Sequence, residues 1–407
     1  MTAYLLEYCN VETFLSVEWN YAFRRNYMAK AFVLMKTGGP ENLKMMDYPT
    51  PKAKPGTIVA DVKLCGICGT DTHIIYGRLP VPLPQLLGHE WFGTIRELGK
   101  GVKVDYTGKP LEKGDFIATC LAKCGKCWFC QNLPGRESLC QNLELVGISP
   151  HKADEPPHFW GAFAEHVYIP ETYPVFKLPK GLTDREMVMI EPIAVATRSF
   201  KRAQSGGTDC AYAGEGVDPS QTVVIQGLGP IGLSHTVVNN VYGMNNIVGV
   251  DIIPERLTQA KKMGATETIS MKEYVTTEDR VEKIMELTDG IGADVVIEAT
   301  GVPAAFSESF KLLRRGGTVV EMGHFTNTGE TKVNPHVDFC NKEVNVFGNW
   351  GYSKFEYRTA IAVMMKAKKM GIPFGEICTE VHPLEDLPAQ ILRQEKKLSP
   401  GKIAIKP

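Results

Sequence analysis

The sequence predicts an α/β protein of two domains, one made of short β strands and one built around a parallel sheet. The chain has 407 residues, more than one ordinary hydrophobic core supports. From about residue 29 to 180, short strand-like segments are interrupted by frequent Gly and Pro. From about residue 222, apolar strands alternate with helices. Such alternation is typical of a parallel sheet with right-handed helical crossovers.

The first domain is recognised by period-two segments. Apolar residues occupy every second position of residues 58–64, which predicts a strand with one buried face. A further strand is expected at 31–35. We therefore expect an irregular β barrel or sandwich whose loops carry function. Residues 1–28 fit neither domain, and Met28 resembles a second start, so this stretch is expected to be an extension.

The second domain begins with a buried strand at 222–226, followed by a helix from the glycine-rich turn to about residue 242. Further strands are expected at 246–250, 293–299 and 318–322, with a helix at 304–314. After about residue 345 the pattern loosens. A helix at 355–369 and a strand at 402–405 are the elements expected there.

Composition excludes several classes of function. The net charge is −1, with 22% charged and 43% hydrophobic residues, so no basic field attracts nucleic acid or an anionic membrane. No apolar run approaches the ~20 residues that span a bilayer. The first 27 residues lack an apolar core and carry Glu7, Glu12 and Glu18, unlike a secretory signal. We expect a cytoplasmic protein whose clustered cysteines bind metal rather than form disulfides.

A glycine-rich turn follows the strand at 222–226 and opens a helix. Its glycines are Gly227, Gly229 and Gly232, the spacing that cradles a pyrophosphate at a helix N-terminus. Asp251 ends the next strand, where a carboxylate accepts from the ribose hydroxyls of NAD and repels a 2′-phosphate. The neighbouring Arg256 leaves NADP as the alternative, since a guanidinium can meet that phosphate.

Four cysteines follow one another as C-x2-C-x2-C-x9-C, at Cys124, Cys127, Cys130 and Cys140. Four thiolates form a closed tetrahedral site for zinc. An iron–sulfur cluster is the alternative. The bacterial cluster pattern has three residues before a fourth Cys followed by Pro, whereas here the gap is nine and Gln141 follows. We therefore expect a structural zinc.

A second, mixed set of candidate ligands lies elsewhere in the sequence. Cys68 supplies a thiolate, His89 an imidazole, and Glu90 and Glu191 carboxylates. Mixed sets leave a position open for water or substrate. We expect Cys68 and His89 to bind zinc. The sequence leaves open whether Glu90 or Glu191 is the resting third ligand.

Zinc beside a dinucleotide suggests alcohol chemistry, because zinc lowers the pKa of bound water from 15.7 to about 7 and acts likewise on an alcohol. Thr70 and His73 follow Cys68 closely and are expected to carry the released proton to solvent. Asp71 is expected to hold the ligand histidine by its other ring nitrogen.

Two stretches carry a family resemblance, Cys65-Gly66-Ile67-Cys68-Gly69-Thr70-Asp71-x-His73 and Gly88-His89-Glu90-x2-Gly93-x5-Gly99-x2-Val102. With them the chain resembles the zinc-dependent medium-chain alcohol/polyol dehydrogenases over residues 29–407. The Glu191-Pro192 pair is similar to the branch of sorbitol, threonine and glucose dehydrogenases, which use Cys, His and Glu at the catalytic zinc.

The resemblance implies a split GroES-like catalytic domain, residues 29–185 and 346–407, with a Rossmann NAD-binding domain, residues 186–345, inserted in it. It also implies two zinc ions per chain, one catalytic and one structural, and a homodimer or homotetramer built through the Rossmann sheet. The expected activity is hydride transfer between NAD and a small alcohol, polyol, sugar or hydroxy amino acid. The alternatives are a non-enzymatic NAD-binding regulator and a zinc-lacking NADP reductase. Both are disfavoured because every zinc ligand is present.

Overall fold

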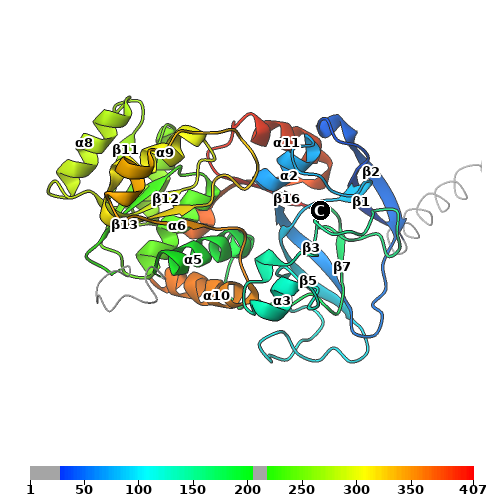
Figure 1. Ribbon diagram of the computed structural model, residues 1–407. Helices are drawn as coiled ribbons and strands as arrows, with labels where there is room; N and C mark the ends of the chain where they lie inside the picture. The colour runs from blue at the N-terminus through cyan, green and yellow to red at the C-terminus, as the bar shows by residue number, and fades with distance from the viewer. Residues whose placement is uncertain (1–27, 205–217) are drawn as a thin grey trace, which may run out of the picture.

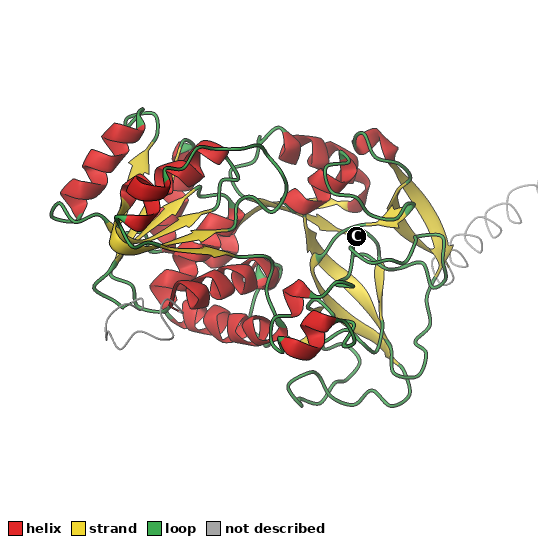
Figure 2. Cartoon of the chain, viewed as in Figure 1, coloured by secondary structure: helices red, strands yellow, loops and turns green. Residues whose placement is uncertain are grey.

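The computed structural model describes residues 28–204 and 218–407, which form two domains that lie side by side (Figure 1). Figure 2 shows a strand-rich domain on one side and a sheet flanked by helices on the other. The predicted extension lies outside the described residues except for Met28, which begins the first strand. No helix in the described ranges is both long enough and apolar enough to cross a bilayer.

The strand-rich domain holds two sheets. The larger has the strand order β15-β16-β3-β5-β6-β8 with β7 paired to β3, and the smaller has the order β2-β1-β4. Its strands are β1 (Met28–Leu34), β2 (Leu43–Pro49), β3 (Ile58–Gly66), β4 (Gln85–Leu86), β5 (Glu90–Leu98), β6 (Phe116–Thr119), β7 (His166–Ile169), β8 (Val175–Lys177), β15 (Cys378–Pro383) and β16 (Lys402–Lys406). Its helices are α2 (Gly69–Ile75), α3 (Trp128–Asn132), α4 (Asp184–Met187) and α11 (Leu387–Glu395).

The second domain is a six-stranded parallel sheet in the order β11-β10-β9-β12-β13-β14. Its strands are β9 (Thr222–Gln226), β10 (Asn246–Asp251), β11 (Glu267–Ser270), β12 (Ala293–Glu298), β13 (Leu313–Glu321) and β14 (Asn345–Gly348). Its helices are α5 (Ile190–Gln204), α6 (Pro230–Val241), α7 (Pro254–Met263), α8 (Thr277–Leu287), α9 (Pro303–Leu312) and α10 (Lys354–Lys369). This order, reversing at β9, is the doubly wound arrangement predicted from the sequence.

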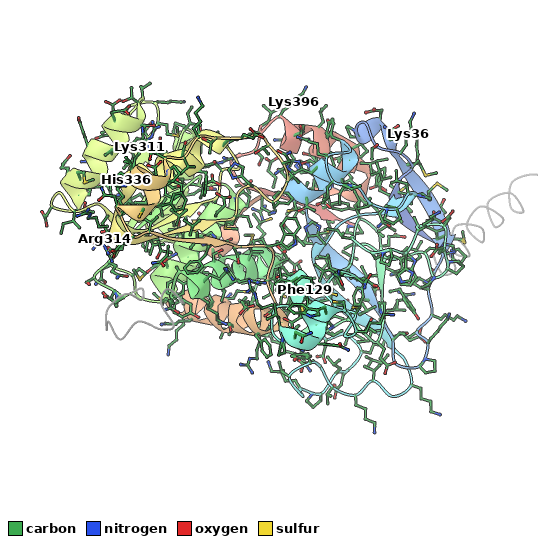
Figure 3. The ribbon with its side chains drawn as sticks, in the orientation of Figure 1. Lys36, Phe129, Lys311, Arg314, His336 and Lys396 are labelled. Atoms are coloured by element: carbon green, nitrogen blue, oxygen red, sulfur yellow. The ribbon has the colours of Figure 1, made fainter. Side chains whose placement is uncertain are left out.

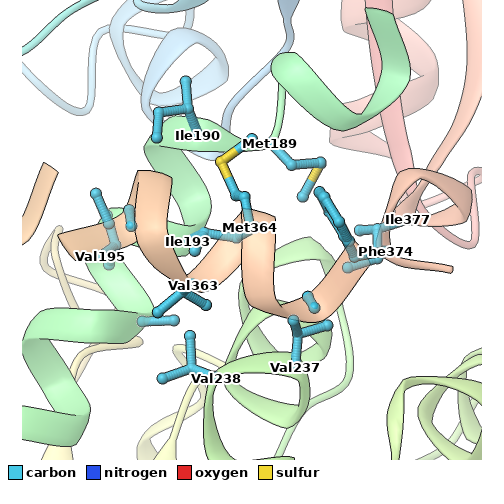
Figure 4. Packing of buried hydrophobic residues seen from close by; sticks show 14 of the residues in the cluster. Met189, Ile190, Ile193, Val195, Val237, Val238, Val363, Met364, Phe374 and Ile377 are labelled. Atoms are coloured by element: carbon cyan, nitrogen blue, oxygen red, sulfur yellow. The ribbon is translucent and has the colours of Figure 1, made fainter. Parts of the chain in front are cut away.

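The parallel sheet is buried on both faces by helices. Successive side chains of each strand point to opposite faces, so each strand contributes to two cores. Val223 and Ile225 of β9 join a core with α5, α6 and α10, part of which is drawn in Figure 4. Val224 points to the other face and packs with Ile284 of α8 and Phe310 of α9. The first of these cores continues into the strand-rich domain, so the two domains share buried surface.

The chain returns to the strand-rich domain later than residue 346. β14 pairs in parallel with β13, and α10 packs against α5. Only β15 and the segments after it rejoin the larger sheet of the first domain. The sequence pattern does not predict β14. It is an edge strand whose residues alternate in exposure, so it lacks the apolar run of a central parallel strand. We propose that the inserted domain extends through α10.

Candidate metal centres and nucleotide site

The four predicted cysteines of the first cluster lie together in a lobe around α3. Their Sγ–Sγ distances are 4.0 Å for Cys124–Cys130, 3.4 Å for Cys127–Cys130, 3.9 Å for Cys127–Cys140 and 3.5 Å for Cys124–Cys140. Zn–S bonds of about 2.3 Å in a tetrahedron place sulfurs about 3.8 Å apart. The lobe therefore has the geometry of a closed zinc site, with no regular structure besides α3 and a short 3-10 turn at Glu137–Leu139.

Backbone N–H groups favour the thiolate form at two of these cysteines. The N–H of Lys126 lowers the pKa of Cys124 to about 6, and that of Gln141 lowers the pKa of Cys127. Burial raises the pKa of Cys130 to about 12 and also raises that of Cys140. The lobe also meets the second domain. The buried Glu137 has its Oε1 3.8 Å from Nζ of Lys354, the first residue of α10, and Ser138 accepts a 2.7 Å hydrogen bond from Arg198 of α5. Figure 3 shows Phe129 of α3 on this side of the molecule.

Cys68, His89 and Glu90 form a second candidate metal group. One ligand atom from each lies within 4.8 Å of the others. β3 ends at Gly66 and β5 begins at Glu90, and these two residues are paired across the sheet, so the strand ends bring the three ligands together. Cys68 is the N-cap of α2, and His89 and Glu90 are buried. The structure thus brings together candidate ligands that the sequence separates by about twenty residues.

Asp71 contacts two members of this group, Cys68 and His89, and is fully buried. Its Oδ2 accepts a 2.8 Å hydrogen bond from the backbone N–H of Cys68, and its Oδ1 lies 3.4 Å from Nδ1 of His89. A carboxylate on one ring nitrogen leaves the other nitrogen for a metal. Although burial lowers it, the pKa of His89 is raised well above its usual value by Asp71 and Cys68.

Lys402, which the sequence did not single out, is buried beside Glu90. Its Nζ is ion-paired with Glu90 Oε2 and donates a 3.1 Å hydrogen bond to the carbonyl of Ile67. β16 runs antiparallel to β3, with Ile405 opposite Cys65, and this pairing carries Lys402 to the site. Glu90 Oε1 has no hydrogen-bond partner among the described residues. Burial lowers the pKa of Lys402, but Glu90 and Cys68 raise it above its usual value overall.

Glu191, in the first turn of α5, lies beside this group but outside the set of atoms within 4.8 Å. Its burial and the neighbouring Glu90 raise the pKa of Glu191 to about 7. Burial and Glu90 likewise raise the pKa of Cys68. The buried carboxyl groups of Asp71, Glu90 and Glu191 lie close together beside Cys68, and this crowding contributes to the raised pKa values of Glu191 and Cys68. A divalent cation would stabilise the ionised forms of these groups, so they fit the zinc that the sequence predicts.

The two predicted proton carriers lie on α2. Thr70 Oγ1 is 3.5 Å from Cys68 Sγ, and His73 lies in the last turn of α2. Burial and the nearby Arg78 lower the pKa of His73, so the imidazole is neutral and able to accept a proton at pH 7. Within the described ranges Thr70 and His73 share no hydrogen bond, so a proton passing between them needs an intervening water or hydroxyl.

The glycine-rich turn follows β9 and opens α6. Gly227 has φ +85°, and a Cβ there would lie 2.8 Å from Thr300. A Cβ on Gly232 would lie 1.8 Å from the carbonyl oxygen of Gly227, so strand and helix pack too closely for any side chain. Gly229, the N-cap of α6, faces open space instead. This combination matches a turn that admits a pyrophosphate at the helix N-terminus.

Asp251 ends β10 next to this turn. Its Oδ2 accepts a 2.7 Å hydrogen bond from Leu228 N–H, and its Oδ1 accepts one of 2.8 Å from Ile253 N–H. Arg256 Nη1 lies 3.7 Å from Asp251 Oδ2. The Arg256 guanidinium also donates to the carbonyls of Pro400 and Ser399, at 3.0 and 3.3 Å. Arg256 is thus held by groups of the chain itself.

Comparisons with known proteins identify the family to which both domains are similar. Residues 54–180 match the alcohol dehydrogenase GroES-like domain, and residues 230–366 match the zinc-binding dehydrogenase family. A probable D-xylulose reductase A of Emericella nidulans is 31% identical, over 86% of this chain and 89% of that protein.

Among solved structures, an alcohol dehydrogenase from Thermotoga maritima has a TM-score of 0.83 at 28% identity, covering 93% of this chain and 99% of that one. A zinc-binding dehydrogenase of Sinorhizobium meliloti, bound to NADP, has a TM-score of 0.77 at 27% identity, with the same coverage.

Proposed function

Because the chain belongs to the zinc-dependent medium-chain alcohol/polyol dehydrogenases, an oxidoreductase family acting on CH–OH groups, we propose that it oxidises a secondary hydroxyl of a small polyol, or reduces the matching ketone. The observation that carries the proposal is the convergence of Cys68 with the buried His89 and Glu90, whose candidate ligand atoms all lie within 4.8 Å of one another. Similarity to a protein named D-xylulose reductase favours a polyol over a simple alcohol.

We propose that Cys68, His89 and Glu90 hold the catalytic zinc, and that Glu191 stands beside it as the alternative carboxylate. Bound zinc would supply Lewis acidity that makes a hydroxyl more acidic. The ammonium of Lys402 offsets the negative charge of Glu90 and fixes the orientation of its carboxylate. The four cysteines of the lobe hold the second, structural zinc. Metal analysis of Glu90→Gln and Glu191→Gln tests the choice of carboxylate, because removal of the resting ligand lowers zinc content more.

The chain's own residues would bind the substrate and move its proton. Thr70 lies next to Cys68, where its hydroxyl can accept a hydrogen bond from the substrate hydroxyl. It can then pass on the proton that the substrate releases. His73 then carries the proton toward solvent, and its lowered pKa keeps the imidazole unprotonated beforehand and favours release of the proton afterwards. Asp71 keeps the imidazole of His89 in the orientation and tautomer that presents its free nitrogen.

We propose NAD as the preferred cofactor. Asp251 places a carboxylate where the adenosine ribose hydroxyls are expected, and it would repel a 2′-phosphate. Arg256 is engaged by Asp251 and by two backbone carbonyls, which disfavours its use on a phosphate. Steady-state kinetics with NAD and NADP test the preference, with a higher kcat/KM for NAD as the expected result.

The decisive experiment is Cys68→Ser, with the exposed Cys340→Ser as the matched control. Rates are followed as NADH formation with xylitol, sorbitol, 2R,3R-butanediol and L-threonine, and NAD binding is followed by calorimetry. Cys68→Ser should abolish turnover and one zinc while NAD binding survives. Unchanged turnover in Cys68→Ser would refute the site. It would favour a zinc-lacking reductase instead, whereas absence of turnover in the unmodified chain would favour the non-enzymatic regulator.

We propose that a second copy of the chain is the protein partner. β14 is the last strand of the parallel sheet, paired only with β13 among the described residues, and Val346 is 36% exposed. An unpaired edge of this kind can pair with the same edge of another copy. Sedimentation of Val346→Lys should show loss of a dimer that the unmodified chain forms. A tetramer remains the alternative assembly, and the cytoplasmic location stays a prediction.

A further inference from the structure

The loop that follows β13 reaches from the nucleotide-binding domain to α2 of the other domain (Figure 1). Thr326 Oγ1 lies 3.3 Å from Nδ1 and 3.4 Å from Nε2 of His73. Phe325 meets the same imidazole edge-on, with ring centroids 5.1 Å apart and the planes at 84°. Two adjacent residues of one domain therefore restrict a side chain of the other.

The start of this loop is held by a partly buried cluster at the ends of β12 and β13, in which only Glu298 is fully buried. His324 Nδ1 lies 2.9 Å from Glu321 Oε1 and 3.3 Å from Glu298 Oε2. Glu321 Oε1 also accepts a 3.0 Å hydrogen bond from the backbone N–H of His324. A Cβ on Gly323 would lie 2.2 Å from Glu298 Oε2, so the turn is pressed against β12. These contacts determine where Phe325 and Thr326 project.

Thr326 is 8% exposed, and in the described part of the chain His73 is the only group that its hydroxyl reaches within hydrogen-bond distance. The charged groups acting on His73 are Arg78 and Glu395, which are ion-paired with each other at 2.7 Å. Neither is an uncompensated charge that would fix the imidazole. The hydroxyl of Thr326 and the ring of Phe325 are therefore the groups that restrict its orientation.

We propose that Thr326 is a positioning residue for His73, supplied across the domain interface. A hydroxyl both donates and accepts, so it can donate to an unprotonated ring nitrogen and accept from a protonated one. It can thus hold the imidazole before and after proton uptake, which a methyl group cannot. The proposal rests on the relay role of His73 given above, and it makes that relay depend on the docking of the two domains.

Thr326→Val tests the proposal, with Thr326→Ser to keep the hydroxyl. Thr328→Val is the matched control in the same loop, because the Thr328 hydroxyl donates at 2.9 Å to the carbonyl of Gly301 in its own domain. The readouts are kcat for alcohol oxidation from pH 6 to 9, its solvent deuterium isotope effect, KM for NAD and melting temperature. The substrate used is whichever of xylitol, sorbitol, 2R,3R-butanediol and L-threonine the unmodified enzyme oxidises at the highest rate. Histidine-selective NMR follows the tautomer of His73 without turnover.

Thr326→Val should lower kcat roughly threefold to tenfold, the value of one hydrogen bond, with a larger isotope effect and an altered tautomer ratio of His73. KM for NAD and melting temperature should not change, and Thr326→Ser and Thr328→Val should resemble the unmodified enzyme. An unchanged pH profile, isotope effect and His73 tautomer in Thr326→Val would overturn the proposal. Equal losses in Thr326→Ser and Thr328→Val would do the same.

His73→Gln separates this proposal from its premise. If His73→Gln alters the pH profile and Thr326→Val does not, the positioning role fails and the relay stands. If His73→Gln leaves both the profile and the isotope effect unchanged, the relay itself is wrong.

Discussion

Replacing Lys402 with Met tests the charge balance of the proposed catalytic site. Lys402 and Glu90 are 3% and 0% exposed, so neither charge is solvated when its partner is removed. The substitution also removes the hydrogen bond to the carbonyl of Ile67. In the zinc-free protein, on which unfolding is measured, it leaves Glu90 without its ammonium partner beside Asp71 and Glu191. Breaking a buried pair from one side costs about 3–5 kcal/mol, so Lys402→Met should lose about that much free energy of unfolding.

Urea unfolding at pH 7 measures this loss, with Lys402→Arg to keep the charge and the exposed Lys369→Met as a control. The control should lie within about 0.5 kcal/mol of the unmodified protein. Glu90→Gln combined with Lys402→Met should lose about 1–3 kcal/mol less than the two single changes added together, because the double variant has no unpaired charge. Strictly additive losses, or a loss under about 1 kcal/mol for Lys402→Met, would refute the reasoning.

Three further outcomes are expected. Cys127→Ser should remove one of two zinc ions by metal analysis and lower the melting temperature, whereas retention of two would contradict a four-thiolate site. Asp251→Ala should raise the kcat/KM ratio of NADP over NAD by about tenfold or more, and an unchanged ratio would show that this carboxylate does not choose the cofactor. Burial raises the pKa of Glu298 to about 7, so its contribution to stability is complete below about pH 4.5 and is lost as the pH rises through 7. Glu298→Gln should flatten the fall in unfolding free energy between pH 5 and 8 by on the order of 1–3 kcal/mol, and an equal fall in both proteins would argue against that titration.

The parts of the fold that were predictable from sequence are those set by local patterns. β9 runs from Thr222 to Gln226 as expected, because an unbroken apolar run ends directly at a glycine-rich turn. The four cysteines of the lobe likewise lie within one short segment, from Cys124 to Cys140. Their thiols therefore come together without contacts to distant parts of the chain. The alternation of strands and helices predicted the α/β architecture, and family resemblance added the GroES-like domain, which the matches to known proteins confirm.

The parts that sequence reasoning missed depend on distant pairings. Lys402 meets Glu90 only because β16 pairs with β3, more than three hundred residues earlier in the chain. Thr326 meets His73 only because the two domains dock. A lone lysine near the C-terminus and a threonine in a polar loop carry no periodic or motif signal, so neither contact could be found from local sequence.

The most direct test of the account is anomalous diffraction at the zinc edge from crystals grown with zinc and NADH. The account predicts two anomalous peaks per chain, one within the four cysteines of the lobe and one between Cys68, His89 and a carboxylate of Glu90 or Glu191. The nicotinamide ring should face the second peak. A single peak in the lobe, or a second peak away from Cys68 and the nicotinamide, would contradict zinc-dependent hydride transfer at this site.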